Sequence, residues 1–338
     1  MDRGRGDMET ASAGMCPLSG DLIDCQNRAM NARLASPLRR RMLAAVAAAA
    51  TAPFWSDLAR AQGRAPIMRP VPATGEALPA IGVGNWITFN VPPDTAAAAS
   101  LIPVLRGFFE RGGAMIDSSP MYGYSETVIG EMLKQTSHPR LFSATKIWTV
   151  GKALGQMQFE RSSRLWGLPK LDLVHVHNLL DWETHLPTLK ELKAAGRVRY
   201  IGITTSEGAK HAEMERALKR ERFDFVQFTY NLADRRVEER LLPLAAEQKI
   251  AVVINRPFDG GWLFPAVRGK PLPPWAREID CENWAQFFLK FVVSHPVVTC
   301  AIPATRQPTH MAENMGALYG RLPDAEMRRR MVKYVEAL

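Results

Sequence analysis

Short apolar runs alternate with amphipathic stretches along most of the chain after residue 80. Eight of these runs have the length of buried strands: Ile81–Val83, Ala114–Ile116, Leu141–Thr145, Leu171–Val176, Tyr200–Ile203, Phe225–Phe228, Ile250–Ile254 and Val297–Ile302. Apolar residues recur at helical spacing between them, most clearly over Ala96–Glu110, His185–Ala195, Ala209–Lys219 and Val237–Glu247. Continuous apolar runs separated by helices are typical of a parallel sheet that is buried on both faces.

Eight strands alternating with helices over about 250 residues predict an α/β fold, a (β/α)8 barrel of the TIM type. A doubly wound sheet is the structural alternative. It favours a Gly-x-Gly-x-x-Gly turn after the first strand, and residues 82–87 lack the third glycine. The stretch Val71–Leu78, centred on Thr74 and Gly75, predicts a short hairpin before the barrel. Residues Arg256–Trp275 are too long for an ordinary connection and are therefore expected to be functional or mobile.

The first 61 residues differ from the rest of the chain. Arginines 39–41 precede an alanine-rich apolar run, Ala44–Trp55, and Ala59-Arg60-Ala61 has the small-x-small pattern of a signal-peptidase site. This arrangement resembles a twin-arginine export signal. The resemblance implies an N-terminal tail and signal peptide over 1–61, a partner in the twin-arginine export machinery, and a periplasmic mature chain of residues 62–338 with no stable membrane span. The alternative is a basic-ended amphipathic segment of a folded, cytoplasmic protein.

Composition excludes several other classes of protein. The chain has 338 residues, 46% hydrophobic and 23% charged, which is typical of a soluble globular protein. The net charge of +9 comes from basic residues scattered among acids, which favours an anionic cofactor over a nucleic-acid surface. Cys16 and Cys25 lie in the leader, and Cys281 and Cys300 lack metal-ligand spacing, so no metal site is expected. The latter two are expected to be buried thiols, although export would permit a disulfide between them.

Candidate chemistry lies at the ends of three predicted strands. Asp117 follows the strand Ala114–Ile116, and Tyr122 lies on the next loop after a Ser-Ser-Pro turn. Lys146 and His177 each follow a later strand. In a barrel the carboxyl ends of parallel strands meet at one rim, so an acid, a phenol, an amine and an imidazole would lie close together there. That combination suits proton transfer.

Asp117, Tyr122, Lys146 and His177 together resemble the catalytic tetrad of the aldo-keto reductases. The resemblance implies hydride transfer from a reduced nicotinamide to a carbonyl carbon, with Tyr122 as the general acid. Lys146, held by Asp117, would keep its charge and lower the pKa of the phenol. His177 would orient and polarise the carbonyl.

The same resemblance implies an NADP(H) site. Gln227, at the end of the sixth strand, would hold the nicotinamide carboxamide. The segment 301–308 resembles the family's adenosine-phosphate loop, where Arg306 would favour NADPH over NADH. The expected cofactor-binding residues are Gly84, Asn85, Thr204, Gln227, Asn255, Arg256, Phe258, Ile302, Thr305, Arg306, His310 and Asn314.

Three positions depart from the family pattern. Thr204-Thr205 replaces a Ser-Asn pair, which keeps a hydroxyl and loses an amide. Asn255 stands where many members place a tyrosine that stacks on the nicotinamide, a contact that is either lost or supplied by Phe258. His175 stands where an apolar or amide side chain is more usual, and we expect it to lie inside the barrel with a structural or supporting role.

Four residues are expected to line the substrate mouth, and they suit a small apolar or aromatic carbonyl: Trp86, Met121, Trp148 and Asn178. Two alternatives to an NADPH-dependent carbonyl reductase remain. One is a nicotinamide-binding redox sensor or regulatory module with little turnover. The other is an exported enzyme that oxidises an alcohol or sugar with retained cofactor.

Overall fold

The computed structural model describes residues 65–338. The predicted tail and signal peptide, with its twin arginines and cleavage pattern, lies outside the described residues, so export stays a prediction. Within residues 65–338 no helix is long and apolar enough to cross a membrane.

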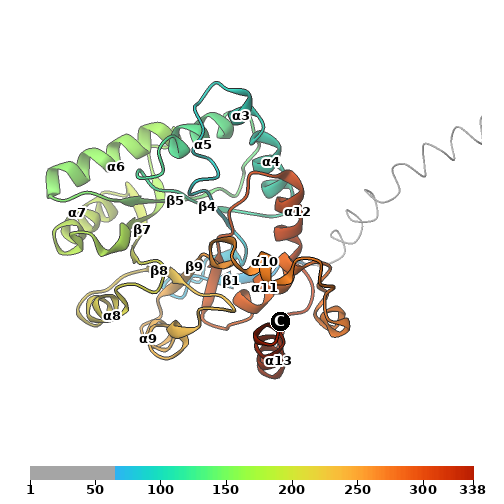
Figure 1. Ribbon diagram of the computed structural model, residues 1–338. Helices are drawn as coiled ribbons and strands as arrows, with labels where there is room; N and C mark the ends of the chain where they lie inside the picture. Colours follow the sequence, from blue (N-terminus) through green and yellow to red (C-terminus); the bar gives the residue numbers. More distant parts are fainter. Residues whose placement is uncertain (1–64) are drawn as a thin grey trace, which may run out of the picture. The chain divides into compact units, whose positions relative to one another are not determined.

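Eight parallel strands within the described part of the chain form a closed barrel (Figure 1). Sequential strands are neighbours throughout the sheet. The first strand also meets the last, because the amide of Gly82 donates to the carbonyl of Ala301 at 2.8 Å and the amide of Ala301 donates to the carbonyl of Ala80 at 2.9 Å. The predicted barrel is therefore confirmed, and the doubly wound alternative is wrong. The strands are β3 Val83–Gly84, β4 Met115–Asp117, β5 Phe142–Ile147, β6 Leu171–Val176, β7 Val198–Thr204, β8 Phe225–Thr229, β9 Ala251–Asn255 and β10 Val298–Ala301.

Helices surround the strands in chain order (Figure 1). The helices that follow the eight strands are α4 Ile102–Glu110, α5 Ser125–Leu133, α6 Lys152–Trp166, α7 Trp182–Ala194, α8 His211–Arg220, α9 Leu241–Glu247, α11 Trp284–Val293 and α12 Pro308–Gly316. Three further helices are α3 Ala96–Ala99, α10 Leu263–Val267 and the C-terminal α13 Ala325–Glu336. The long segment after β9 is folded and not a bare loop, because it contains α10 and the short 3-10 helices Asp259–Gly261 and Pro274–Ile279.

Two helices predicted as continuous are each divided in two. Ala96–Glu110 contains α3 and α4, with Pro103 in the first turn of α4. Val237–Glu247 contains the end of the 3-10 helix Arg236–Glu238 and then α9, with Pro243 near its start. Proline lacks an amide donor and is tolerated in the first turn of a helix, so each of the two helices starts anew just before its proline. Apolar periodicity alone did not reveal these breaks.

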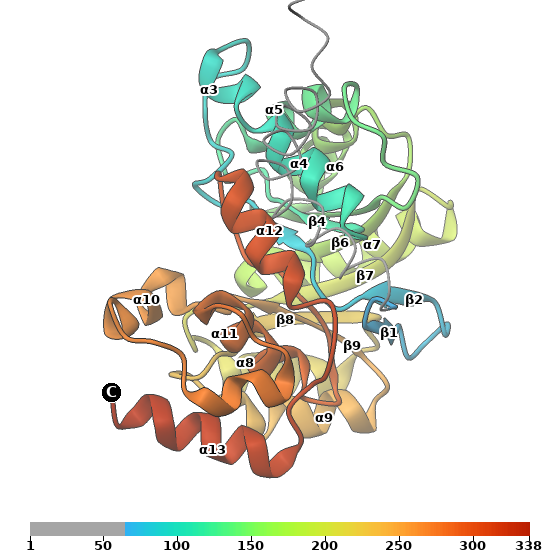
Figure 2. The ribbon, with the colours of Figure 1, turned by 90° about the vertical axis from the view of Figure 1, so that its right-hand side faces the viewer.

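The predicted hairpin lies at the amino-terminal end of the barrel (Figure 2), and aromatic rings fill that end. The rings of Phe142, Tyr200 and Phe225 lie inside the barrel with centroids 5.2–5.9 Å apart. The hairpin pairs β1 Met68–Pro70 with β2 Ala77–Pro79 in antiparallel register. On the turn between them, Glu76 accepts a hydrogen bond of 2.6 Å from the Tyr200 hydroxyl. Chemistry is thereby confined to the opposite, carboxyl end of the strands.

Cys281 and Cys300 are buried free thiols, as expected, and do not form a disulfide. Cys300 lies inside the barrel, where burial raises the pKa of its thiol.

Close approach of β4 and β10 makes Gly82, the residue before β3, sensitive to substitution. An added Cβ would lie 2.8 Å from the carbonyl oxygen of Met115 and 3.1 Å from Sγ of Cys300. Gly82→Ala is expected to lower the free energy of unfolding by about 1–3 kcal/mol in denaturant titrations, because backbone must move to make room. Gly107→Ala is the control. Its Cβ would meet only the flexible end of Arg111 within α4, so it should be neutral or stabilising.

Candidate active site

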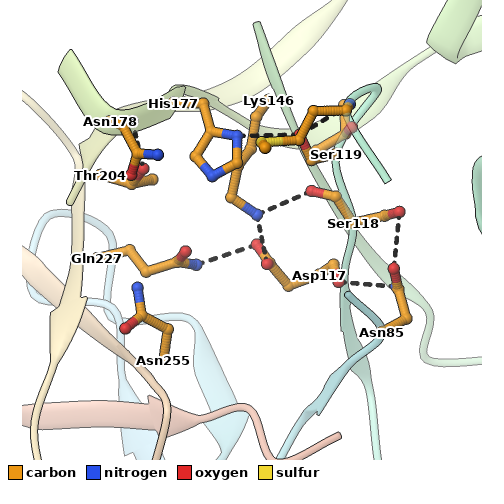
Figure 3. A network of polar contacts seen from close by, with 12 residues as sticks. Asn85, Asp117, Ser118, Ser119, Lys146, His177, Asn178, Thr204, Gln227 and Asn255 are labelled. Atoms are coloured by element: carbon orange, nitrogen blue, oxygen red, sulfur yellow. Dashed lines mark hydrogen bonds and ion pairs between the residues drawn. The ribbon is translucent and has the colours of Figure 1, made fainter. Parts of the chain in front are cut away.

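A buried ion pair lies at the carboxyl end of β4 and β5. Lys146 is fully buried, and its Nζ donates hydrogen bonds to Oδ2 of Asp117 and, at 2.8 Å, to the carbonyl of Ser118. The other carboxylate oxygen of Asp117 accepts a hydrogen bond of 3.0 Å from Nε2 of Gln227 (Figure 3). Each charge therefore has an opposite charge and a further polar partner, which a buried pair requires.

Asn85 fixes the loop that begins at Asp117. Its Nδ2 donates to the carbonyl of Asp117 at 2.8 Å, and its Oδ1 accepts from the Ser118 hydroxyl at 2.9 Å. Asn85 is buried. The sequence analysis assigned Asn85 to the cofactor, and that assignment stays a prediction; in the structure the two ends of its side chain bind the Asp117 carbonyl and the Ser118 hydroxyl.

Tyr122 and His177 flank the ion pair. Their rings meet edge to face with centroids 5.8 Å apart, and Nζ of Lys146 lies 5.5 Å from the centroid of the Tyr122 ring. Nδ1 of His177 is 3.0 Å from the Ser119 hydroxyl oxygen. The structure thus brings together all four residues that the sequence analysis chose from separate strands.

The protonation states follow from burial. Desolvation, and then the charge of Lys146, lower the pKa of His177 to about 2, so its imidazole is neutral at physiological pH. Desolvation, and then the charge of Asp117, raise the pKa of Tyr122 above that of a free phenol. The net shift is therefore opposite in direction to the one that the charge of Lys146 alone would cause. The ammonium is compensated by Asp117, so its field at the phenol is largely cancelled.

Side-chain amides and a hydroxyl gather beside the ion pair, from the turn after β6 and from β7, β8 and β9 (Figure 3). The backbone N–H of Asn178 donates to Oγ1 of Thr204 at 2.9 Å, and Asn178 has a φ of 52°. Its side-chain Oδ1 is buried and has no hydrogen-bond partner among the described residues. Asn255 accepts from the Thr229 hydroxyl at 2.7 Å and donates to the carbonyl of Thr205 at 2.8 Å. Such a group of donors and acceptors fits a carboxamide, the polar group of a nicotinamide.

The segment predicted to bind adenosine phosphate leads into the N-terminus of α12. Thr305 is buried and accepts a hydrogen bond of 3.1 Å from the amide of Gln307. Arg306 and His310 are exposed, and Asn314 is buried. A helix N-terminus with an exposed arginine beside it fits an anionic phosphate. Upstream, Ile302 is buried inside the barrel.

Close approach of β3 to the last strand explains the glycine at position 84. A Cβ on Gly84 would lie 2.8 Å from the carbonyl oxygen of Ile302. Both residues were assigned to the cofactor, and in the structure they lie at the seam where the barrel closes.

Arg256 and Phe258, also assigned to the cofactor, lie in the segment after β9. Arg256 has a φ of 47° and forms an ion pair of 2.7 Å with Glu207 on the loop after β7. Phe258 is buried and packs its ring against Phe264 at a centroid distance of 4.9 Å and against Phe288 at 6.5 Å. These apolar partners do not favour Phe258 as the replacement for a stacking tyrosine.

Exposed apolar side chains surround the mouth on the loops after β3, β4 and β5. Trp86, Met121 and Trp148 have exposed fractions of 51%, 37% and 41%. Gln158 on α6 holds the Trp148 backbone from both sides, since its Oε1 accepts from the amide at 2.5 Å and its Nε2 donates to the carbonyl at 3.1 Å. Exposed rings on a tethered loop are consistent with the predicted substrate mouth.

Sequence analysis missed Ser119 and Glu126. It treated the two serines after Asp117 only as the turn that ends the strand. A hydroxyl between an acid and a phenol could have been read as a further candidate site residue. Glu126, at the start of α5, is buried and accepts hydrogen bonds from Thr145 at 2.6 Å, Ser162 at 2.9 Å and Trp166 at 3.1 Å. Since Thr145 precedes Lys146, this carboxylate anchors the strand that carries the lysine.

Burial of a neutral His177 makes folding depend on pH. The folded protein leaves the ring unprotonated down to about pH 2, whereas the unfolded chain protonates it below about pH 6.5. Stability is therefore lost as pH falls from about 6.5, and His177→Gln should remove about 1–2 kcal/mol of the loss between pH 6.5 and 5. Denaturant midpoints across this range measure the effect. His310→Gln, at an exposed site, should leave the slope unchanged, and an unchanged slope in His177→Gln would contradict the assignment.

Comparison with known proteins agrees with this geometry. The model of the aldo/keto reductase family matches residues 80–332. The NADH-specific methylglyoxal reductase of Escherichia coli (strain K12) is 23% identical over 79% of this chain and 98% of its own length. A solved aldo-keto reductase from Klebsiella pneumoniae in complex with NADPH superposes with a TM-score of 0.66 at 25% identity, over 80% of this chain and 95% of that one. With the barrel and the four converging residues, the match over residues 80–332 shows that the chain belongs to the aldo/keto reductase family, a family of oxidoreductases.

Proposed function

We propose that this protein reduces an aldehyde or ketone to an alcohol with NADPH, and that Tyr122 is the general acid. The observation that carries the proposal is the convergence of the Asp117–Lys146 ion pair, the Tyr122 phenol and a neutral His177 at one end of the barrel. When bound, a reduced nicotinamide would supply the hydride. The chain's own residues would supply the proton and stabilise the charge that develops on the carbonyl oxygen.

The hydrogen bonds of Ser119 support a specific tautomer of His177. Oγ of Ser119 accepts a hydrogen bond from the amide of Met121 at 3.3 Å, so its own proton is free to point at Nδ1 of His177. An imidazole that accepts at Nδ1 carries its proton on Nε2. His177 would then donate from Nε2 to the substrate carbonyl and orient it.

Tyr122 is protonated across the physiological range because burial and Asp117 raise its pKa. The phenol would donate its proton as negative charge develops on the substrate oxygen. The phenolate left behind would lie near the Lys146 ammonium, whose charge would partly offset the effects of burial and of Asp117.

NADPH is favoured over NADH by Arg306, which is exposed beside the N-terminus of α12 and suits a phosphate. The Klebsiella pneumoniae relative was solved with NADPH, whereas the Escherichia coli relative is named NADH-specific. At the nicotinamide end, Asn178, Thr204, Gln227 and Asn255 would hold the carboxamide. The residues present therefore fit both ends of the cofactor.

The substrate would be a carbonyl compound with an apolar or aromatic group, because Trp86, Met121 and Trp148 are exposed around the mouth. Residues 1–61 support export by the twin-arginine route, which carries folded proteins with cofactor already bound. A redox sensor with little turnover is the second candidate, favoured by the raised pKa of Tyr122, since a weaker acid donates more slowly. NADPH binding without turnover of any carbonyl would distinguish it.

Removal of the phenol tests the assignment of the acid. Tyr122→Phe is expected to lower kcat by about 10²–10⁴-fold in NADPH oxidation assays with a panel of aromatic and aliphatic aldehydes, with NADPH affinity retained. Tyr124→Phe, an exposed phenol two residues away, is the control and should keep full activity. Equal turnover by Tyr122→Phe and the unaltered protein would refute the role.

The cofactor preference depends on Arg306. Arg306→Ala should raise the Kd for NADPH about tenfold to a hundredfold, through loss of charge-assisted hydrogen bonds, and leave the Kd for NADH nearly unchanged. Titration of cofactor fluorescence measures both constants. Arg268→Ala, at another exposed arginine, should affect neither constant. Equal losses for the two cofactors would place the guanidinium away from the phosphate.

A further inference from the structure

His175 is a buried imidazole without protein partners. Its side chain is fully buried on β6, and neither Nδ1 nor Nε2 has a hydrogen-bond partner among the described residues. Unpaired buried polar atoms are costly, about 1–3 kcal/mol each, so a histidine in place of an apolar side chain calls for a function.

Strand register places His175 between two neighbours inside the barrel. Its Cα pairs with Lys146 on β5 and with Gly202 on β7. A Cβ on Gly202 would lie 2.6 Å from Cδ2 and 3.1 Å from Nε2 of the imidazole. Gly202 therefore provides the room that the ring occupies, and the ring lies beside the stem of the buried lysine.

One of the three N–H groups of the Lys146 ammonium has no acceptor among the described residues. An ammonium carries three N–H groups, and those of Lys146 have two acceptors among the described residues, Asp117 and Ser118. Desolvation lowers the pKa of this lysine, so an additional acceptor would help to keep it charged. A neutral imidazole offers one acceptor nitrogen and one donor. The imidazole of His175 is neutral because burial lowers its pKa and the nearby charge of Lys146 lowers it further.

We propose that His175 is a positioning residue for Lys146, and that one ordered water joins them: the water accepts the third ammonium N–H and donates its own proton to the neutral imidazole. No direct hydrogen bond joins the two side chains, and a buried water needs two or more polar partners, which the lysine and the imidazole supply. The inference rests on the proposed function, since it explains how the lysine beside Tyr122 stays charged inside an apolar barrel.

Other titratable groups surround the lysine and remain in place in the test. They are Asp117 at the end of β4, Tyr122 on the connection that follows, Glu126 at the start of α5, and His177 after β6. The test therefore changes His175 alone and follows Lys146 directly.

The experiment measures the titration midpoint of Lys146 in the full chain by NMR of ¹³C-labelled lysine ε-carbons, assigned with Lys146→Met. His175→Leu removes the acceptor and should lower the midpoint by about one pH unit, roughly tenfold in the ammonium–amine equilibrium. The alkaline limb of the kcat profile should shift equally. His175→Gln, whose amide oxygen also accepts, should restore the midpoint. His175→Met serves as the apolar variant if His175→Leu does not fold.

His185→Leu is the matched control. His185 is fully buried on α7 and also lies against a glycine, since a Cβ on Gly155 would be 2.6 Å from its Nδ1. Its replacement should reduce stability and leave the Lys146 midpoint unchanged. An unchanged midpoint in both apolar variants of His175 would overturn the proposal and leave His175 as a space-filling residue. If the unaltered protein reduces no carbonyl while the Lys146 midpoint still falls in the apolar variants of His175, the proposed function fails and the positioning role of His175 stands.

Discussion

A lysine and an aspartate without access to water are the constraint around which this structure is organised. Transfer of two charges into a protein interior costs several kcal/mol per ion, and only good geometry with further hydrogen bonds offsets it. Ser118, Gln227 and, through the backbone, Asn85 provide those bonds around Lys146 and Asp117. The interior of the barrel is therefore polar and fixed at the carboxyl end of the strands, whereas aromatic rings fill it at the amino-terminal end.

The same constraint explains why the two residues of the ion pair lie on strands and not on loops. Lys146 lies within β5, and Asp117 is the last residue of β4, so their backbones are held by the parallel ladder. Glu126 binds the residue next to Lys146 and connects the strand to α5 and α6. Tyr122 follows on a short connection. A site supported in this way needs little reorganisation when charge develops on a substrate oxygen.

The pKa of Tyr122 depends on all the charges around it inside the barrel and not on Lys146 alone. A lysine near a phenol lowers the pKa of that phenol in isolation, yet Asp117 neutralises this lysine and adds its own field. The resting protein therefore holds a neutral Tyr122 and a neutral His177 beside one compensated ion pair. In the proposed reaction, charge separation would occur only as the proton is transferred, where it would contribute to the rate.

The sequence by itself determined the barrel and its hairpin, and it singled out four side chains that the structure brings together. Apolar runs of strand length are a local signal, and Asp117, Lys146 and His177 each lie at or next to the end of one, so their common rim followed from topology. Only the tertiary structure decided the partners of Asn85, the apolar packing of Phe258, the role of Ser119 in holding His177, and the sign of the pKa shift of Tyr122. The physical reason is distance along the chain: a strand is specified by its own residues, whereas burial and hydrogen bonds join segments that only the closed sheet brings together.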